Sequence, residues 1–81
     1  MNQLLERILG IPALGLTPTD RIVLFHLTQN PQGSRIEDIA RFTGSKYRWV
    51  ATEVSKLTRI GVLRRVGPNT YAMNADFEVQ P

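Results

Sequence analysis

The chain has 81 residues, 42% hydrophobic and 21% charged, with a net charge of +3, which is the composition of one small globular domain. This length excludes a second domain, and the lack of cysteine together with a single histidine excludes a disulfide framework and a cysteine or histidine ligand cluster for a metal. No apolar run approaches the roughly 20 residues that span a bilayer, and the opening MNQLLERILG lacks the basic region and cleavage site of a signal peptide, so we expect a soluble, cytoplasmic protein.

The first helix is expected at residues 3–9, with Asn2 as its cap and Gly10 as its end. Its apolar side is too large for two helical turns standing alone, because an isolated helix of this length is unstable in water. The helix must therefore pack on another surface. Residues 11–16 contain proline and glycine and are interpreted as a connector.

A strong start signal marks the second helix. Thr17 can cap the helix, Pro18 falls at the first helical position where its missing N–H costs nothing, and Asp20 can complete a capping box. The helix is expected to run to about Gln29 and to stop before an Asn-Pro pair.

The second helix carries two apolar strips. One is the inner face, formed by Val23, Leu24 and Leu27. The other lies on the far side and consists of Ile22 and Phe25. Since both this strip and the N-terminal helix lack another partner, we expect that helix either to cover the strip or to pair with a second copy of the chain.

A third helix is expected after a turn at residues 31–33 and a very short strand at 35–36. It covers residues 37–42, and its inward side chains are Ile39 and Ala40. Thr43 and Gly44 then form a tight turn. A helix, a turn of about three residues and another helix is the spacing of a helix-turn-helix.

The fourth helix is expected between Ser45, as its N-cap, and Gly61, which tolerates a positive φ. At roughly 100° per residue, one face of this helix is apolar and the opposite face is polar. The apolar face consists of Tyr47, Val50, Val54 and Leu57, and the polar face of Arg48, Thr52, Ser55 and Arg59. Trp49 and Lys56 lie together on the flank of the polar face.

Residues 62–66 and 70–74 are rich in β-branched and aromatic side chains and predict a β-hairpin. Pro68 disfavours a two-residue primed turn, so a somewhat longer loop is expected. Residues 75–81 have no periodicity and are interpreted as a tail or linker. The predicted fold class is mainly α with a small β-hairpin, divided into an N-terminal helix and connector, a central domain and the tail, at residues 1–15, 16–74 and 75–81.

The order of these elements, from Leu16 to Asn74, resembles the winged helix-turn-helix domains of bacterial transcription regulators, in the broad class that includes the MarR-like proteins. The matching segments are LTPTDRIVLFHL for the first helix of the domain, IEDIARFTGS for the next helix and turn, and VATEVSKLTRIGVLRRV for the recognition helix and the start of the wing. The resemblance implies a DNA-binding domain of a bacterial, plasmid or phage protein that acts in transcription, replication or partition. Trp49 stands where many relatives carry a small polar residue, and the sequence leaves open whether it contacts DNA or packs against a neighbouring element.

The basic residues are concentrated in one half of the chain. Residues 35–65 contain eight basic and three acidic side chains, a balance of +5, whereas the rest has a balance of −2. Such a distribution favours a polyanionic partner. Together with the helix pattern it predicts double-stranded DNA as the partner. The predicted contacts are Ser45, Lys46, Arg48, Trp49, Thr52, Lys56, Arg64, Arg65 and Asn69, with Thr70, Arg35 and Arg41 as weaker candidates.

Other polar residues are given structural interpretations. His26 lies inside an amphipathic helix and is interpreted as a boundary residue, and the adjacent Glu37 and Asp38 as favourable charges at a helix N-terminus. Since the sequence shows no nucleophile with a base, metal cluster or phosphate-binding loop, we expect a non-enzyme without a cofactor. The alternative function is a protein-protein interaction module, in which Trp49 and Tyr47 anchor an acidic protein partner.

Overall fold

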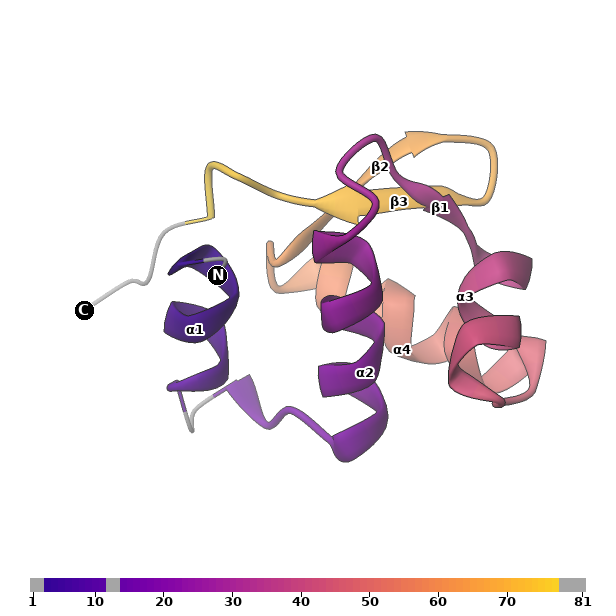
Figure 1. Ribbon diagram of the computed structural model, residues 1–81, viewed down its shortest axis with the longest axis horizontal. Coiled ribbons are helices and arrows are strands. Elements are labelled where there is room, and N and C mark those ends of the chain that lie inside the picture. The colour runs from indigo at the N-terminus through magenta and orange to yellow at the C-terminus, as the bar shows by residue number, and fades with distance from the viewer. Residues whose placement is uncertain (1–2, 12–13, 78–81) are drawn as a thin grey trace.

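The computed structural model describes residues 3–11 and 14–77. Within these residues the chain is an α+β domain of four helices and one three-stranded antiparallel sheet (Figure 1). The elements in chain order are α1 (Gln3–Leu9), α2 (Pro18–Thr28), β1 (Ser34–Arg35), α3 (Ile36–Thr43), α4 (Tyr47–Arg59), β2 (Leu63–Gly67) and β3 (Thr70–Met73). The sheet lies at one end of the helices (Figure 1). Among the described residues, no helix is long and apolar enough to cross a membrane.

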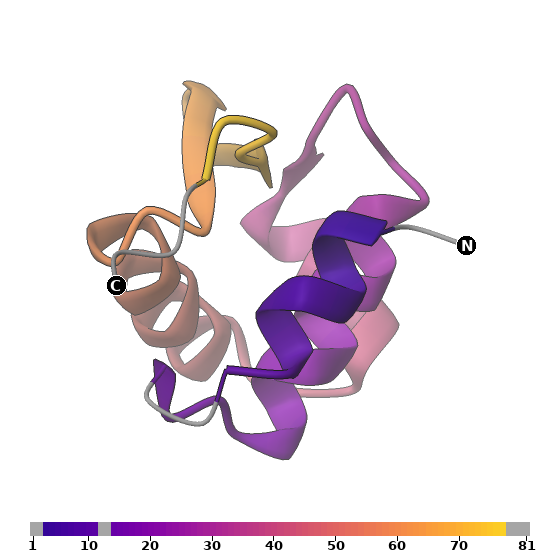
Figure 2. The same cartoon turned by 90° about the vertical axis from the view of Figure 1, so that its left-hand side faces the viewer.

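Helix α1 has the predicted bounds and lies beside α2 (Figure 2). Ile8 is fully buried in the same cluster as side chains of α2, α3 and α4. The helix leaves Ile22 and Phe25 of α2 44% and 49% exposed, so the prediction that it covers this strip is wrong. Its apolar side packs against the edge of the core instead. Pairing with a second copy stays a prediction, and the expected cap, Asn2, lies outside the described residues.

The start of α2 is as predicted. The Thr17 hydroxyl accepts a hydrogen bond from the Asp20 N–H at 3.1 Å, and the Asp20 carboxylate accepts one from the Thr17 N–H at 2.8 Å. Pro18 occupies the first helical turn. The capping box is therefore complete, and the three predicted inner residues of α2 are fully buried: Val23, Leu24 and Leu27.

Helices α3 and α4 are joined by a turn that differs from the prediction at one residue. Gly44 adopts the left-handed conformation, with φ 71°. The N–H of Ser45 then donates to the Ala40 carbonyl oxygen at 3.2 Å, a bond that closes the end of α3. Helix α4 begins only at Tyr47, with Lys46 at the N-cap position. The prediction that Ser45 caps α4 is wrong, because Ser45 serves the end of the preceding helix.

The inner face of α4 is formed by Val50, Val54 and Leu57, which are fully buried as predicted. Tyr47 was expected on the same face but is 48% exposed, because the first turn of the helix extends beyond the buried cluster. Glu53 was not expected in the interior, yet it is buried. The predicted end of α4 is confirmed: Gly61 has φ 90° and directly follows the C-cap.

The predicted hairpin forms the larger part of the sheet, whose strand order is β1-β3-β2. Gly67 pairs with Thr70, so the loop consists of Pro68 and Asn69 alone and the prediction of a longer loop is wrong. Because proline fixes a negative φ and Asn69 has φ 51°, this two-residue turn is not a primed one. An irregularity between Arg65 and Gly67 adjusts the register. The predicted short strand is present as β1, shifted by one residue, and pairs with β3.

The start of the expected tail packs on the domain. The Asn74 N–H donates to the Val62 carbonyl oxygen at 2.9 Å, and the Asn74 amide donates to the Gly61 carbonyl oxygen at 2.9 Å. Phe77 is half-buried and packs against the core beside Gly61. Of the expected tail, Phe77 thus packs against the domain, whereas Ala75 and Asp76 are exposed and residues 78–81 lie outside the described chain.

Candidate nucleic-acid interface

The side of α4 away from the core is a continuous polar surface. We call it the outer face of α4 and define it by Arg48, Thr52, Ser55 and Arg59, all of which are exposed as predicted. The Thr52 hydroxyl donates to the Arg48 carbonyl oxygen at 3.1 Å and keeps its lone pairs as acceptors. Within the described residues, no carboxylate forms an ion pair with Arg48 or Arg59. Both guanidinium groups therefore retain their full charge and donor capacity.

The turn before α4 and its first helical turn hold the next three predicted residues. Ser45 is half-buried, and its backbone N–H is bonded to the Ala40 carbonyl oxygen of α3. Lys46 is exposed at the N-cap position. Trp49 is 50% exposed, which means that the core does not take up its ring.

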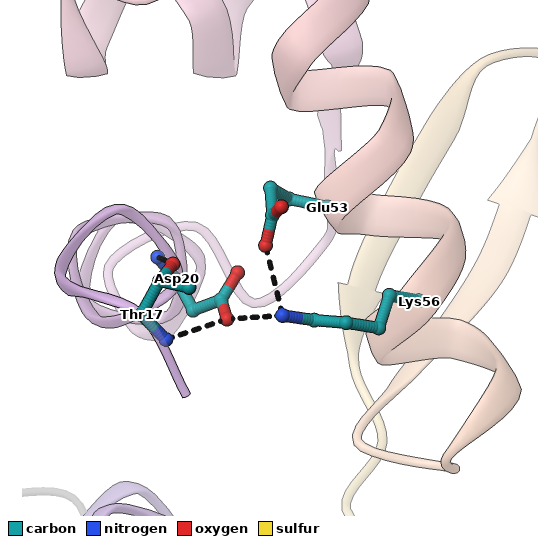
Figure 3. A network of polar contacts seen from close by, with 4 residues as sticks. All are labelled: Thr17, Asp20, Glu53 and Lys56. Atoms are coloured by element: carbon teal, nitrogen blue, oxygen red, sulfur yellow. Dashed lines mark hydrogen bonds and ion pairs between the residues drawn. The ribbon is translucent and has the colours of Figure 1, made fainter. Parts of the chain in front are cut away.

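Lys56 lies differently from the other predicted cations of α4. Its Nζ is 2.7 Å from Asp20 Oδ2 on α2 and 3.0 Å from Glu53 Oε2 on its own helix (Figure 3). The ammonium group of Lys56 is therefore bound to two carboxylates within the domain. Lys56 joins α4 to the first turn of α2, which fixes the direction in which the outer face of α4 points.

Thr17, Asp20, Glu53 and Lys56 form a polar cluster, in which the pKa values of the three ionisable side chains are shifted. Burial by itself raises the pKa of Asp20, but hydrogen bonds with Glu53, Lys56 and Thr17 outweigh it and hold that pKa below its ordinary value. The hydrogen bond to Asp20, together with burial, raises the pKa of Glu53. The hydrogen bond to Asp20 also raises the pKa of Lys56. Asp20 Oδ1 receives no hydrogen bond from any fixed donor of the described chain, so a protonated Glu53 carboxyl group would be able to donate to it.

The hairpin places its cations on two sides. Arg64 and Arg65 are both exposed on β2, but successive residues of a strand point to opposite faces of the sheet. Arg65 Nε donates to the Gly67 carbonyl oxygen at 3.2 Å, which holds this side chain near the turn. Asn69 is exposed at the tip of the turn, and the Thr70 hydroxyl beside it donates to the Pro68 carbonyl oxygen at 2.8 Å.

The two weaker candidates on and beside α3 are paired with acids. Arg35 lies 3.2 Å from a Glu37 oxygen, and Arg41 lies 3.1 Å from an Asp38 oxygen. All four side chains are substantially exposed, so these pairs are weak and do not prevent either arginine from meeting another anion. Glu37 and Asp38 occupy the first turn of α3, as predicted.

His26 connects three elements through structural contacts. Its Nε2 is 3.0 Å from the Ser34 hydroxyl of β1, and its ring centroid is 4.6 Å from that of Phe42 on α3. Burial lowers the pKa of His26, although the nearby Asp38 opposes the shift. These contacts agree with the interpretation of His26 as a boundary residue.

The buried carboxylates of this region, Asp20 and Glu53, were not predicted as an interior pair from the sequence. Glu53 lies only about 40 to 60° around α4 from Val50 and Leu57, so a helical projection already places its carboxylate beside the core. Its partner Asp20 is 36 positions away from Lys56, and no local pattern reveals that pairing.

Taken together, α4 presents unpaired cations and hydroxyl groups outward, and β2 packs against α4 and adds exposed arginines. Arginine and lysine bind phosphate oxygens, and the planar guanidinium can also donate two parallel hydrogen bonds to one acceptor pair. No protein-family model matches the chain, and no curated protein or solved structure is significantly similar to it.

Proposed function

We propose that this chain is a winged helix-turn-helix domain that binds double-stranded DNA in a sequence-specific manner. In this proposal α3 and α4 are the helix-turn-helix, α4 is the recognition helix and the β2–β3 hairpin is the wing. The observation that carries it is the outer face of α4, where Arg48 and Arg59 are exposed and unpaired within the described residues. A helix of this kind fits the major groove, whose base edges differ for each base pair.

The residues of this surface have different roles in the proposal. Arg48 bridges the O6 and N7 atoms of a guanine, because its fork matches these two acceptors. Lys46 and Thr52 contact a base edge or a phosphate. Arg64, Arg65 and Asn69 contact the sugar-phosphate backbone beside the groove, which fixes affinity and register more than sequence preference. Lys56 acts indirectly, by holding α4 on α2.

The proposed setting is a cytoplasmic bacterial, plasmid or phage regulator of transcription, replication or partition, without catalytic activity or a cofactor. The resemblance of LTPTDRIVLFHL, IEDIARFTGS and VATEVSKLTRIGVLRRV to the MarR-like class supports this setting. The basic balance of residues 35–65 supports the polyanionic partner.

The test is the binding of random and genomic duplex DNA across a range of salt concentrations. With about four to six phosphate contacts, the logarithm of the association constant should fall against the logarithm of salt with a slope near −4 to −5. Binding should be measurable at about 50 mM salt even on random sequence, because counterion release acts on any duplex. A flat salt response, or no binding at that concentration, would contradict the proposal.

A protein-protein interaction module is the second candidate, and the exposure of Trp49 and Tyr47 favours it. Tryptophan and tyrosine are enriched among the residues that dominate protein interfaces. An acidic protein partner would then take the place of DNA on the same surface. Retention of a synthetic acidic polypeptide, together with no binding of duplex DNA, would establish this alternative over the first.

We also infer that a second copy of the chain pairs with this one. The predicted route through α1 has less support than before, because Ile8 and its neighbours are taken up by the core of the same chain. Ile22 and Phe25 of α2 remain as the exposed apolar strip, and a two-fold pair would fit half-sites about 10 base pairs apart. The test is the mass in solution of the wild type and of an Ile22→Asn, Phe25→Gln variant. If both have the mass of a monomer, such a pair is excluded.

A further inference from the structure

The aromatic side chains of this protein lie mostly outside its core. The buried hydrophobic residues of the described chain are all isoleucine, leucine, valine or alanine. Of the six aromatic residues, two pack partly buried against this core, Tyr71 and Phe77, and the other four are about half exposed: Phe25, Phe42, Tyr47 and Trp49. Exposure of large rings to water is unfavourable, so exposed rings that lie near one another indicate a surface that binds a partner.

Two of these rings flank an arginine at the start of α4. Tyr47, Arg48 and Trp49 are consecutive, so at 100° per residue the rings project from opposite sides of the helix with Arg48 between them. Side chains of a helix tilt toward its N-terminus, and all three therefore extend over the first turn. No ring stacking involves Tyr47 or Trp49 among the described residues, and no carboxylate there pairs with Arg48 or Lys46.

Ring faces and duplex DNA are poorly matched. A base stacked in a duplex offers its edges to the groove and hides its faces, whereas aromatic side chains gain most from stacking on the face of a base. Tyr47 and Trp49 therefore gain little stacking energy from an intact duplex.

We propose that the first turn of α4 binds DNA that contains unpaired bases, such as a bubble or a junction between single and double strands. Tyr47 and Trp49 stack on the unpaired bases, while Lys46 binds an adjacent phosphate and Arg48 keeps its contact with a base edge. The positive balance of residues 35–65 favours a nucleic acid over an apolar partner. The inference rests on the proposed function, because it uses the same helix and the same cations, and it adds the state of the DNA that this helix prefers.

Trp49 is the only tryptophan of the chain, so the intrinsic fluorescence of the unmodified protein reports directly on this surface. The protein is titrated with a duplex of about 30 base pairs and with the same duplex carrying about six central mismatched pairs, a size within the range of single-stranded binding sites. The mismatched DNA should bind about 5- to 150-fold more tightly, the range expected from stacking of one base on an aromatic ring. It should also quench the tryptophan emission more strongly at saturation.

Single variants show whether the preference for mismatched DNA comes from stacking on Tyr47 and Trp49 or from exposed aromatic rings in general. Trp49→Ala and Tyr47→Ala should each reduce the preference for mismatched DNA, measured by anisotropy of a labelled oligonucleotide, while affinity for the matched duplex changes less than about threefold. Trp49→Phe should retain most of the preference, because a ring remains. Phe42→Ala is the matched control, since Phe42 is equally exposed but lies on α3 and is not a proposed DNA contact, and it should leave the preference unchanged. Melting curves of all variants verify that they are folded.

Equal affinity for matched and mismatched DNA, with equal quenching, would overturn this inference while leaving duplex binding intact. Preferential binding of an acidic polypeptide with strong quenching of Trp49 would also overturn it, in favour of a protein partner. Failure to bind any of the DNAs would contradict the proposed function itself.

Discussion

Two cations of the same helix illustrate how position decides the role of a residue. Arg48 projects from the side of α4 opposite the buried face and meets no carboxylate within the described chain. Lys56 projects from the flank toward α2 and binds the buried Asp20 at 2.7 Å. A charge that has satisfied a buried carboxylate cannot leave it at low cost, because the carboxylate would remain unpaired. Arg48, and not Lys56, is therefore the residue on which sequence recognition should depend.

Arg48→Ala removes the guanidinium group that we propose contacts base edges. On the preferred DNA site we expect a loss of about 1 to 3 kcal/mol in binding free energy, with a much smaller loss on random DNA. Arg59→Ala is the control, since Arg59 lies on the same outer face three turns further along and loses the same charge. It should weaken both DNAs by similar factors. If Arg48→Ala also weakens both DNAs equally, Arg48 is a phosphate contact and another residue specifies the sequence.

At the scale of single residues, the sequence was sufficient where the helical period alone decides. Val50, Val54 and Leu57 were predicted inside, and Arg48, Thr52 and Ser55 outside, and the structure agrees. The sequence was insufficient where a partner distant in the chain decides. The burial of Glu53 depends on the position of α2, and the exposure of Tyr47 depends on where the core ends.

At the scale of the elements, the local sequence was a good predictor of where helices end and a poor predictor of which strands pair in the sheet. The Thr17 capping box and the glycine after α4 are complete within a few residues, so sequence was enough to place them. Ser45 is of a residue type that often caps helices, but it does not cap α4. The left-handed conformation of Gly44 brings the Ser45 N–H to the Ala40 carbonyl oxygen, where it closes the end of α3. The pairing of β1 with β3 joins residues more than 30 positions apart, which no local pattern specifies.

The hairpin should contribute affinity rather than sequence preference. The Arg64→Ala, Arg65→Ala double variant removes two charges that we propose contact the DNA backbone, so binding of specific and random duplexes should weaken by similar factors. The magnitude of the salt slope should fall by about 1 to 2. Because these neighbours point to opposite faces of the sheet, the two single variants should be unequal.

Titration of both single variants over salt concentration identifies the face of the hairpin that lies on DNA. Arg21→Ala is a suitable control, because Arg21 is exposed on α2 and is not a proposed DNA contact. Relaxed sequence preference in the double variant would mean that the hairpin, and not α4, contacts the bases.

On the scale of the whole molecule, one polar cluster links helix α2 to helix α4. Asp20 and Glu53 are the only buried charged side chains of the described residues, and Lys56 lies between them. Breaking such a cluster by removing one partner leaves an uncompensated charge in the interior, which costs about 3 to 5 kcal/mol. The orientation of α4, and with it the surface that we propose binds DNA, should therefore depend on how many protons this cluster holds.

The stability of the domain should consequently pass through a maximum in the acidic range. The pKa of Asp20 is lowered from its ordinary value of 3.8, so its contribution is present above that pH and is lost as pH falls through the folded-state pKa. The pKa of Glu53 is raised from 4.5, so its contribution is present below that pH and is lost as pH rises through the folded-state pKa. Above pH 4.5, Glu53 alone should therefore lower the free energy of unfolding by at most about 1.4 kcal/mol per pH unit.

Glu53→Gln isolates this effect, because glutamine keeps the shape of the side chain and has no proton to lose. Chemical denaturation of both proteins at a series of pH values gives the free energy of unfolding at each one. The wild type should lose stability relative to Glu53→Gln as pH rises above 4.5, until the folded-state pKa of Glu53 is passed, and the difference should then level off. Below 3.8 both proteins should weaken together, since both retain Asp20. Parallel curves at every pH would show that Glu53 does not hold a proton in the folded state and that Lys56 neutralises two ionised carboxylates.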